Sequence, residues 1–182
     1  IAKYGDQLAK IAEKNKVNLE FEAAVCGGVP VVRTLKEGLI SNSISKIYGV
    51  LNGTSNYILT LMDKKNIDFE SALKKAQSLG YAESNPTSDL NGDDVSSKLK
   101  ILTALCFNSY INKININVEG IHDIDQTDII NANNFGYKIK LLGVSELVNK
   151  KVTQRVHPCL IKKSSYIGDI SGVLNAVIIE GS

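Results

Sequence analysis

The sequence predicts an α+β fold with a mixed, largely antiparallel β-sheet backed by helices. Segments with apolar residues three or four positions apart are interspersed with segments in which every second residue is apolar, without a regular strand-helix-strand order. Late in the chain, strand-like segments follow one another at hairpin spacing, which favours antiparallel pairing. A chain of 182 residues can bury one substantial core, so residues 1–182 are predicted to form one domain.

The first part of the chain predicts two helices and two strands. Apolar spacing predicts a helix over residues 2–15, and alternation predicts a strand over residues 17–24. A glycine pair follows, and Pro30 is predicted to begin a helix that runs to about residue 41, because the missing proline N–H has no partner in a first helical turn. Residues 44–51 are rich in β-branched and aromatic residues and predict a strand.

Two helices and a long loop come next. Thr54 is predicted to cap the first helix, and Asp68 is predicted to cap the second, which ends at Gly80. Residues 80–93 contain proline, glycine and asparagine and predict a long loop, of the kind that often carries function. The remaining expected elements are a helix over residues 94–107, a helix near 126–135, and strands over 115–121, 138–147, 151–160 and 175–181.

The composition argues against several classes of protein. The net charge is only +2, and basic pairs such as Lys64-Lys65 have no interleaved aromatic residues, so nucleic-acid binding is not expected. No apolar run is long enough to cross a bilayer, so no membrane role is expected. The widely separated Cys26, Cys106 and Cys159 indicate reduced thiols in a cytoplasmic protein. Because the chain begins with isoleucine inside a predicted helix, we expect an internal portion of a longer protein.

An acid and a base four residues apart fall on the apolar side of the helix that begins near Asp94. On a wheel of about 100° per residue, Lys98 lies between Leu102 and Leu105, and Asp94 lies in the same apolar arc. An unpaired charge on a core-facing side is very costly. One interpretation is an ion pair whose lysine stem covers apolar surface while the ammonium group reaches water.

The loop before this helix supplies more carboxylates and opens a second interpretation. Glu83 and Asp89 would lie close to Asp94 and Lys98, so that up to three carboxylates converge on one ammonium group. Convergent charges in a partly desolvated cleft suit a polar substrate and a proton transfer. The same carboxylates would equally compensate the dipole at the helix start.

A second candidate site lies in EAAVCGGVP, residues 22–30. Two adjacent glycines allow a sharp bend that points carbonyl groups inward, and with Glu22 beside them a site for a hard cation is conceivable. A tight turn between a strand and a helix is the alternative. His122 and His157 are isolated and lack metal-ligand spacing, and no dinucleotide-binding glycine motif occurs in the chain.

Several motifs, taken in order, resemble homoserine dehydrogenase. They are EAAVCGGVPVVRTL, ISKIYGVLNGTSNYILTLM, FESALKKAQSLGYAESNPTSDLNGDDVSSKLKIL and GYKIKLLG, and together they extend over nearly the whole chain. The resemblance implies an oxidoreductase that interconverts L-homoserine and L-aspartate 4-semialdehyde with NAD or NADP, in the biosynthesis of threonine, methionine and isoleucine. It also implies a homodimer through the sheet and a nucleotide site mostly outside this chain, so the chain alone is expected to be inactive.

The resemblance also assigns roles to individual residues. Lys98 matches the proton donor and acceptor, and Glu83 and Asp94 match the acids that bind homoserine. The other positions that match residues of the same pocket are Asp89, Tyr81, Gly53 and Thr54. The positions that match the family's sodium site, formed mostly by backbone carbonyls, are Glu22, Val25, Gly27 and Val29. The alternative hypothesis is a non-catalytic substrate-binding or dimerisation module of an aspartokinase fusion or an inactive paralogue.

Overall fold

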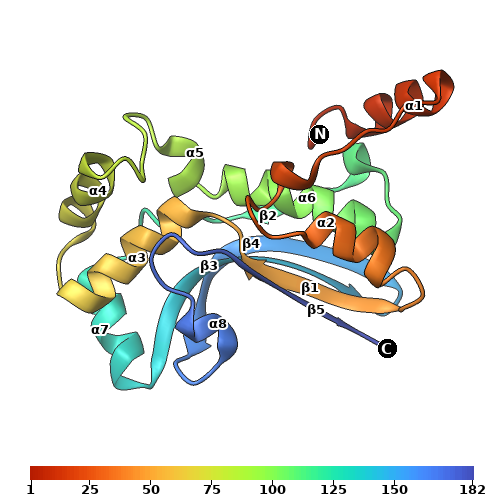
Figure 1. Cartoon of the computed structure of the whole chain (residues 1–182). Helices are drawn as coiled ribbons and strands as arrows, with labels where there is room; N and C mark the ends of the chain where they lie inside the picture. Colours follow the sequence, from red (N-terminus) through yellow and green to blue (C-terminus); the bar gives the residue numbers. More distant parts are fainter.

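A five-stranded sheet with helices mainly on one of its faces forms the fold (Figure 1). The computed structural model describes residues 1–111 and 113–182, and Asn112 only as part of a short helix. The strand order is β2-β4-β3-β1-β5, and all neighbours are antiparallel except β2 and β4. The predicted α+β fold with a mixed, largely antiparallel sheet is therefore confirmed. The strands are β1 (Ile44–Val50), β2 (Asn117–Val118), β3 (Tyr137–Val148), β4 (Lys151–Lys162) and β5 (Ala176–Gly181).

The helices agree with most of the predicted segments. The α-helices are α1 (Gly5–Asn15), α2 (Val31–Arg33), α3 (Gly53–Lys65), α4 (Phe69–Ser78), α5 (Thr87–Leu90), α6 (Asp93–Phe107), α7 (Gln126–Asn134) and α8 (Tyr166–Asp169). A π-helical turn, η2 (Thr34–Gly38), continues α2, and the 3₁₀ turns are η1 (Glu22–Ala24) and η3 (Ile111–Lys113). The helix from about residue 30 to 41 is thus confirmed as α2 plus η2.

A tight hairpin joins the two longest strands, β3 and β4. Their pairing runs from Tyr137 opposite Lys162 to the turn at Asn149 and Lys150. These turn residues have φ angles of 50° and 63°, and a type I′ hairpin turn requires positive φ at both of its central positions. The hairpin gives the sheet its length and carries the surface on which α6 packs.

α6 packs closely on the sheet because β3 has a glycine beneath it. A Cβ atom at Gly143 would lie 3.1 Å from Leu51, 3.2 Å from Val95 and 3.5 Å from Leu99, so a larger residue would require the Leu51 and Val95 side chains to shift. Val95 and Leu99 are fully buried in this contact. Other fully buried core residues between the helices and the sheet are Ile47, Leu51, Ile58, Leu59, Met62, Leu102, Ile121 and Leu141. This packing fixes the position of the first two turns of α6, which carry Asp94 and Lys98, relative to the sheet.

The strand predicted over residues 17–24 is wrong. Residues 17–21 belong to no helix or strand, and Glu22–Ala24 form the 3₁₀ turn η1. Alternation of Val17, Leu19 and Phe21 provides two faces, but a strand also needs a neighbouring strand for its backbone hydrogen bonds. The sheet consists of β1 to β5, and residues 17–21 pair with none of these strands.

The predicted caps are right at one helix and wrong at another. Asp68 caps α4 as predicted, because its side chain accepts a hydrogen bond from the backbone N–H of Ser71 at 2.9 Å. The cap of α3 is Asn52 and not Thr54, whose hydroxyl instead donates to the carbonyl of Tyr81 at 2.7 Å. The long loop is also interrupted by α5, and the strand predicted over residues 115–121 is reduced to the two residues of β2.

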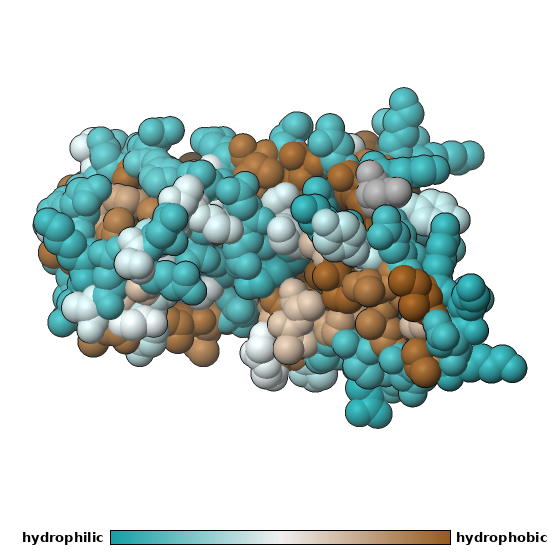
Figure 2. All heavy atoms as spheres, turned by 90° about the horizontal axis from the view of Figure 1, so that it is seen from above, coloured by the Kyte–Doolittle hydropathy of each residue, from teal (hydrophilic) through white to brown (hydrophobic). Residues whose placement is uncertain are grey.

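α1 projects from the rest of the molecule (Figure 1). Gly5 is its one buried residue, while Leu8 and Ile11 are exposed. From the helix side, the left part of the surface is mostly hydrophilic, and larger hydrophobic patches lie on the right, the side on which α1 projects (Figure 2). Within the described part of the chain, no helix has the length and hydropathy needed to span a membrane.

Candidate active site

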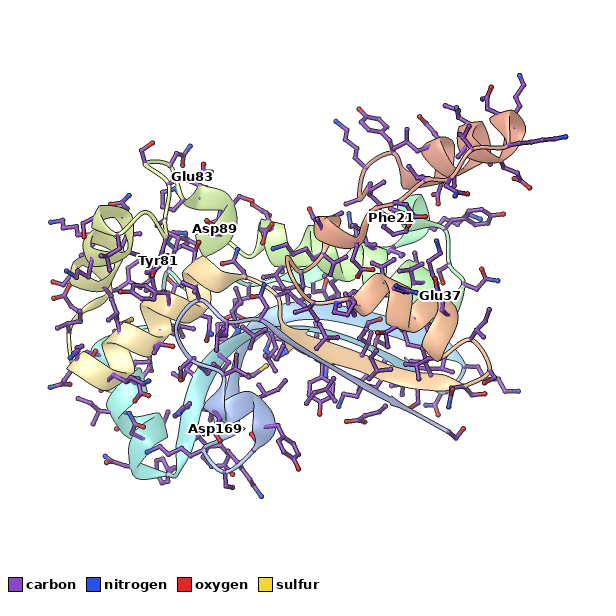
Figure 3. The ribbon with its side chains drawn as sticks, in the orientation of Figure 1. Phe21, Glu37, Tyr81, Glu83, Asp89 and Asp169 are labelled. Carbon is purple, nitrogen blue, oxygen red and sulfur yellow. The ribbon has the colours of Figure 1, made fainter. Side chains whose placement is uncertain are left out.

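One cavity of about 450 Å³ collects the predicted substrate residues. It lies where the end of β1, the start of α3, the loop into α5 and the first turns of α6 meet. Figure 3 shows Tyr81, Glu83 and Asp89 around α5 and the loop that leads to it. The predicted residues that line the cavity are Gly53, Thr54, Tyr81, Glu83, Asp89, Asp94 and Lys98, and the residues that were not predicted are Asn52, Gly80 and Val173.

Lys98 is held at this cavity by two acceptors. Its ammonium nitrogen lies 2.7 Å from Asp94 Oδ2 and donates to the carbonyl of Leu51 at 2.9 Å. The Lys98 side chain is 20% exposed, so the ammonium group sits at the rim of the buried helix face. An ammonium group has three N–H donors, so one of them remains to contact a ligand in the cavity. The ion pair predicted from the helical wheel is present, and its charged end lines a cavity.

The carboxylates converge less tightly on the ammonium group than the sequence suggested. Among the described residues, Lys98 forms an ion pair with Asp94 alone. Asp89 is linked to it indirectly, because the side-chain amide of Asn52 donates to Asp89 Oδ1 at 2.7 Å and to Asp94 Oδ2 at 2.8 Å. Glu83 is exposed at the cavity wall, where its backbone carbonyl accepts a hydrogen bond from Gln77. The cavity is therefore acidic, with one cation at its inner end.

The loop between α4 and α5 is tied to α3 at the cavity edge. The Thr54 hydroxyl donates to the carbonyl of Tyr81, and the Tyr81 ring lies 4.8 Å from the Tyr57 ring, centroid to centroid. Gly80 ends the α4 turn with a φ of 75°, which favours glycine. These contacts bring Tyr81 and Glu83 to the same cavity as α3.

Val173, which belongs to a segment of residues 170–174 that we call the strap, forms another part of the cavity wall. Gly53 is required here, because a Cβ at this position would lie 2.8 Å from the carbonyl oxygen of Val173. Asn56 of α3 donates to the carbonyl of Leu174 at 3.1 Å. Buried Lys140 donates to Asn56 Oδ1 at 2.8 Å and to the carbonyl of Ile170 at 2.6 Å, so one ammonium group fixes both α3 and the strap.

The candidate cation loop lies close to this cavity. Glu22 already uses its carboxylate, which accepts hydrogen bonds from the backbone N–H groups of Val32 at 2.7 Å and Arg33 at 2.9 Å. Burial raises the pKa of the Cys26 thiol, while nearby Lys98 lowers it. No cluster of three or more His, Cys, Asp or Glu side chains suited to a metal occurs among the described residues. A cation in this loop would therefore depend on backbone carbonyls, which are suitable ligands for hard cations.

Comparison with known proteins identifies the family. Residues 30–182 match the family model described as homoserine dehydrogenase. The chain belongs to the homoserine dehydrogenase family. It is 46% identical over 180 residues to the homoserine dehydrogenase of Neisseria gonorrhoeae, a match that covers 99% of this chain and 41% of that protein.

Solved homoserine dehydrogenase structures share the fold. The enzyme from Thiobacillus denitrificans superposes with a TM-score of 0.96 at 42% identity, over 99% of this chain and 42% of the other. A hyperthermophilic archaeal homoserine dehydrogenase in complex with NADPH superposes with a TM-score of 0.85 at 27% identity, over 100% of this chain and 52% of the other. The chain thus spans less than half of the curated relative from Neisseria gonorrhoeae and about half of the archaeal one.

The sequence did not reveal Asn52, Gly80 and Val173 as cavity residues of this chain. Asn52 follows a strand and precedes a helix, and the preference of asparagine for N-cap positions was an available signal for its local role. Its contacts with Asp89 and Asp94 span 37 and 42 residues, and no local pattern encodes them. Val173 reaches the cavity from even farther along the chain.

Proposed function

We propose that the complete gene product interconverts L-homoserine and L-aspartate 4-semialdehyde, and that this chain supplies its substrate site. The observation that carries the proposal is the Lys98 ammonium group, held by Asp94 and the Leu51 carbonyl at the inner end of an acidic cavity. A cavity with carboxylates and one cation suits an amino-acid substrate. A purely structural module would have no need for a charged pair opening into a cavity.

Lys98 is the proton donor and acceptor in this proposal. In reduction, an N–H of the ammonium group gives its proton to the aldehyde oxygen as a hydride reaches the carbonyl carbon, and the alcohol forms. In oxidation, the neutral amine of Lys98 accepts the hydroxyl proton while the hydride leaves the same carbon. Asp94 keeps the nitrogen in place in both directions, and NAD or NADP, when bound, supplies or accepts the hydride.

The acidic side of the cavity binds the substrate's α-ammonium group. Glu83 and Asp89 present carboxylates there. A carboxylate accepts strong hydrogen bonds from an ammonium group in a partly desolvated site. Tyr81, Thr54 and Gly53 shape the remaining wall. The preference between NAD and NADP is set by the nucleotide domain of the complete protein, and the relative solved with NADPH is an example with the phosphorylated nucleotide.

We also infer a sodium ion in the loop that follows η1. The ligands would be the backbone carbonyls of Glu22, Val25, Gly27 and Val29. The carbonyls of Val25 and Gly27 accept no hydrogen bond from any described residue, which leaves them available to a hard cation. The ion would stiffen a loop whose Cys26 lies within electrostatic range of Lys98.

We infer further that the protein is a cytoplasmic homodimer. All three cysteines are free thiols, which fits a reducing compartment. Helices cover mainly one face of the sheet, and the other face, covered only at one end by α8, is the surface through which two copies would associate (Figure 1).

The experiment is the Lys98→Met exchange in the complete gene product. We expect kcat for homoserine oxidation to fall by about a hundredfold or more, because the step loses its proton acceptor. Binding of NAD(P), measured by calorimetry, should stay unchanged, because Lys98 acts on the substrate. The matched control is Lys100→Met, which removes a charge two residues further along α6, outside the cavity. A Lys98→Met protein with wild-type kcat would refute the catalytic role of this lysine.

A further inference from the structure

Asn52 is a buried side chain with contacts to both acidic elements of the cavity. Its exposed fraction is 4%. Oδ1 accepts a hydrogen bond from the backbone N–H of Ser55 at 2.8 Å, and this contact identifies the other terminal atom as the amide nitrogen. Nδ2 then donates its two hydrogens to Asp89 Oδ1 at 2.7 Å and Asp94 Oδ2 at 2.8 Å. The side chain thus does more than cap α3.

A closed ring of contacts connects Asn52 to Lys98. Asp94 Oδ2 accepts from the Asn52 amide and also pairs with the Lys98 ammonium group at 2.7 Å. The same ammonium group donates to the carbonyl of Leu51, the residue that precedes Asn52. Two groups hold the lysine: the Asp94 carboxylate, which Asn52 positions, and the carbonyl of Leu51. Both therefore depend on the two residues that follow β1.

Asn52 also holds two like charges side by side. Asp89 belongs to α5 and Asp94 to α6, and without a bridging donor their carboxylates would repel each other. The amide binds one oxygen of each carboxylate and carries no charge itself, so the cavity keeps its full negative charge. A lysine or arginine at this position would bring the carboxylates together but neutralise part of that charge.

We propose that Asn52 is a positioning residue for the reaction. By bridging Asp89 and Asp94, it fixes the Lys98 ammonium group against the reacting oxygen and keeps the acidic surface that receives the α-ammonium group of the substrate. This inference rests on the proposed function, because it assigns Asn52 a part in that reaction.

The variants Asn52→Ser and Asn52→Asp separate this role from helix capping. Serine, aspartate and asparagine are comparable N-cap residues, so a pure cap would tolerate both changes about equally. Serine is too short to bridge the carboxylates, and aspartate adds a third negative charge beside them. In the complete gene product at neutral pH, we expect Asn52→Ser to lower kcat and raise the KM for homoserine by about tenfold each. Asn52→Asp should lower kcat and raise the KM for homoserine by a further factor of about ten each. The KM for NAD(P) should not change in either variant.

The pH profile gives an independent readout. A protonated carboxyl group carries one O–H donor, so the carboxyl introduced by Asn52→Asp regains one of the two lost hydrogen bonds when it is protonated. The activity of Asn52→Asp relative to wild type should therefore increase as the pH falls from about 8 to about 6. Asn52→Ser has no group that titrates and should show no such recovery.

The control is Asp68→Ser, which changes the cap of α4 in the same way and lies outside the cavity. It should leave both KM values unchanged. Two outcomes would show that Asn52 serves merely as a helix cap. Either Asn52→Asp is at least as active as Asn52→Ser at neutral pH, or both variants keep wild-type kcat and KM. Should either variant be too unstable for kinetics, a crystal structure of the other decides: Asp94 and Lys98 in unchanged positions would overturn the inference. A wild-type gene product without activity on homoserine would instead refute the proposed function.

Discussion

Lys140 shows at the scale of one residue how a charge inside the protein is tolerated. Only 2% of its surface is exposed, and its ammonium group donates to Asn56 Oδ1 and the carbonyl of Ile170. Burial, with smaller contributions from nearby Lys138 and Lys64 and against the opposing effect of Asp63, lowers the pKa of Lys140 from 10.5 to about 8. Between these two pKa values the unfolded chain binds more protons than the folded protein, so stability rises with pH across that window.

This linkage predicts the effect of Lys140→Met on stability at different pH values. Methionine has a similar length and no charge, so the variant lacks the pH-dependent contribution. We expect the unfolding free energy of the wild type to increase relative to the variant as the pH rises from 8 to 10.5, by a total on the order of 3 kcal/mol. Urea unfolding at several pH values measures this difference.

Lys151→Met, at an exposed position of β4, controls for the loss of one positive charge. A constant stability difference between wild type and Lys140→Met from pH 8 to 10.5 would contradict the lowered pKa of Lys140.

The residues of the site divide into those that local patterns reveal and those that only the fold brings together. Asp94 and Lys98 are four positions apart on one helix, so the helical period alone predicted that they would lie together on its apolar face. Asn52, Asp89 and Val173 come from separate elements, and their approach depends on how α3, α5 and the strap pack. The position of Asp89 in the loop just before the helix predicted its proximity to Asp94 and Lys98, and the family resemblance agreed, whereas neither source supplied Asn52 or Val173.

At the scale of elements, the start of α2 depends on a residue from the preceding turn. Glu22 accepts hydrogen bonds from the N–H groups of Val32 and Arg33, and a negative charge at a helix start is also favoured by the helix dipole. We expect Glu22→Gln to lower the unfolding free energy by about 1 to 2 kcal/mol, because the charge and one acceptor are lost. Urea unfolding at neutral pH measures this loss.

Glu37→Gln is the matched control for Glu22→Gln. It removes the ion pair between Glu37 and Arg33, whose side chains are 65% and 74% exposed, and exposed pairs contribute little to stability. Equal losses from the two changes would show that the Glu22 carboxylate does not anchor α2.

The sequence predicted a helix or strand correctly where the local apolar pattern agrees with the packing and pairing that the segment has in the fold. The periodic segments of α3, α4 and α6 and the long strands β3 and β4 were predicted within a few residues. Residues 17–21 alternate as a strand does but have no strand beside them, and the segment around β2 pairs over only two residues. Periodicity indicates which faces a segment offers, and the hydrogen-bond partner of its backbone decides whether a strand forms.

At the scale of the whole molecule, the two faces of the sheet are covered unequally. Most helices pack on one face, while α8 reaches one end of the other (Figure 1). Val50, Leu142, Val144 and Ile167 are buried on that second side. Tyr48 and Ile178, neighbours on β1 and β5, are only partly buried there and would be covered fully by a second copy.

The homodimer proposed through this face predicts the effect of a charge placed on it. Ile178→Lys in the complete gene product should convert the dimer to monomers, because an ammonium group without a partner is costly in an apolar interface. Light scattering after size-exclusion chromatography measures the mass directly. Ile40→Lys is the matched control, since Ile40 is 79% exposed and precedes β1 on the chain, outside the second-face cluster. If Ile178→Lys keeps the wild-type mass while remaining folded, association uses another surface, and the sheet face would then have to be stable in water with Tyr48 and Ile178 partly exposed.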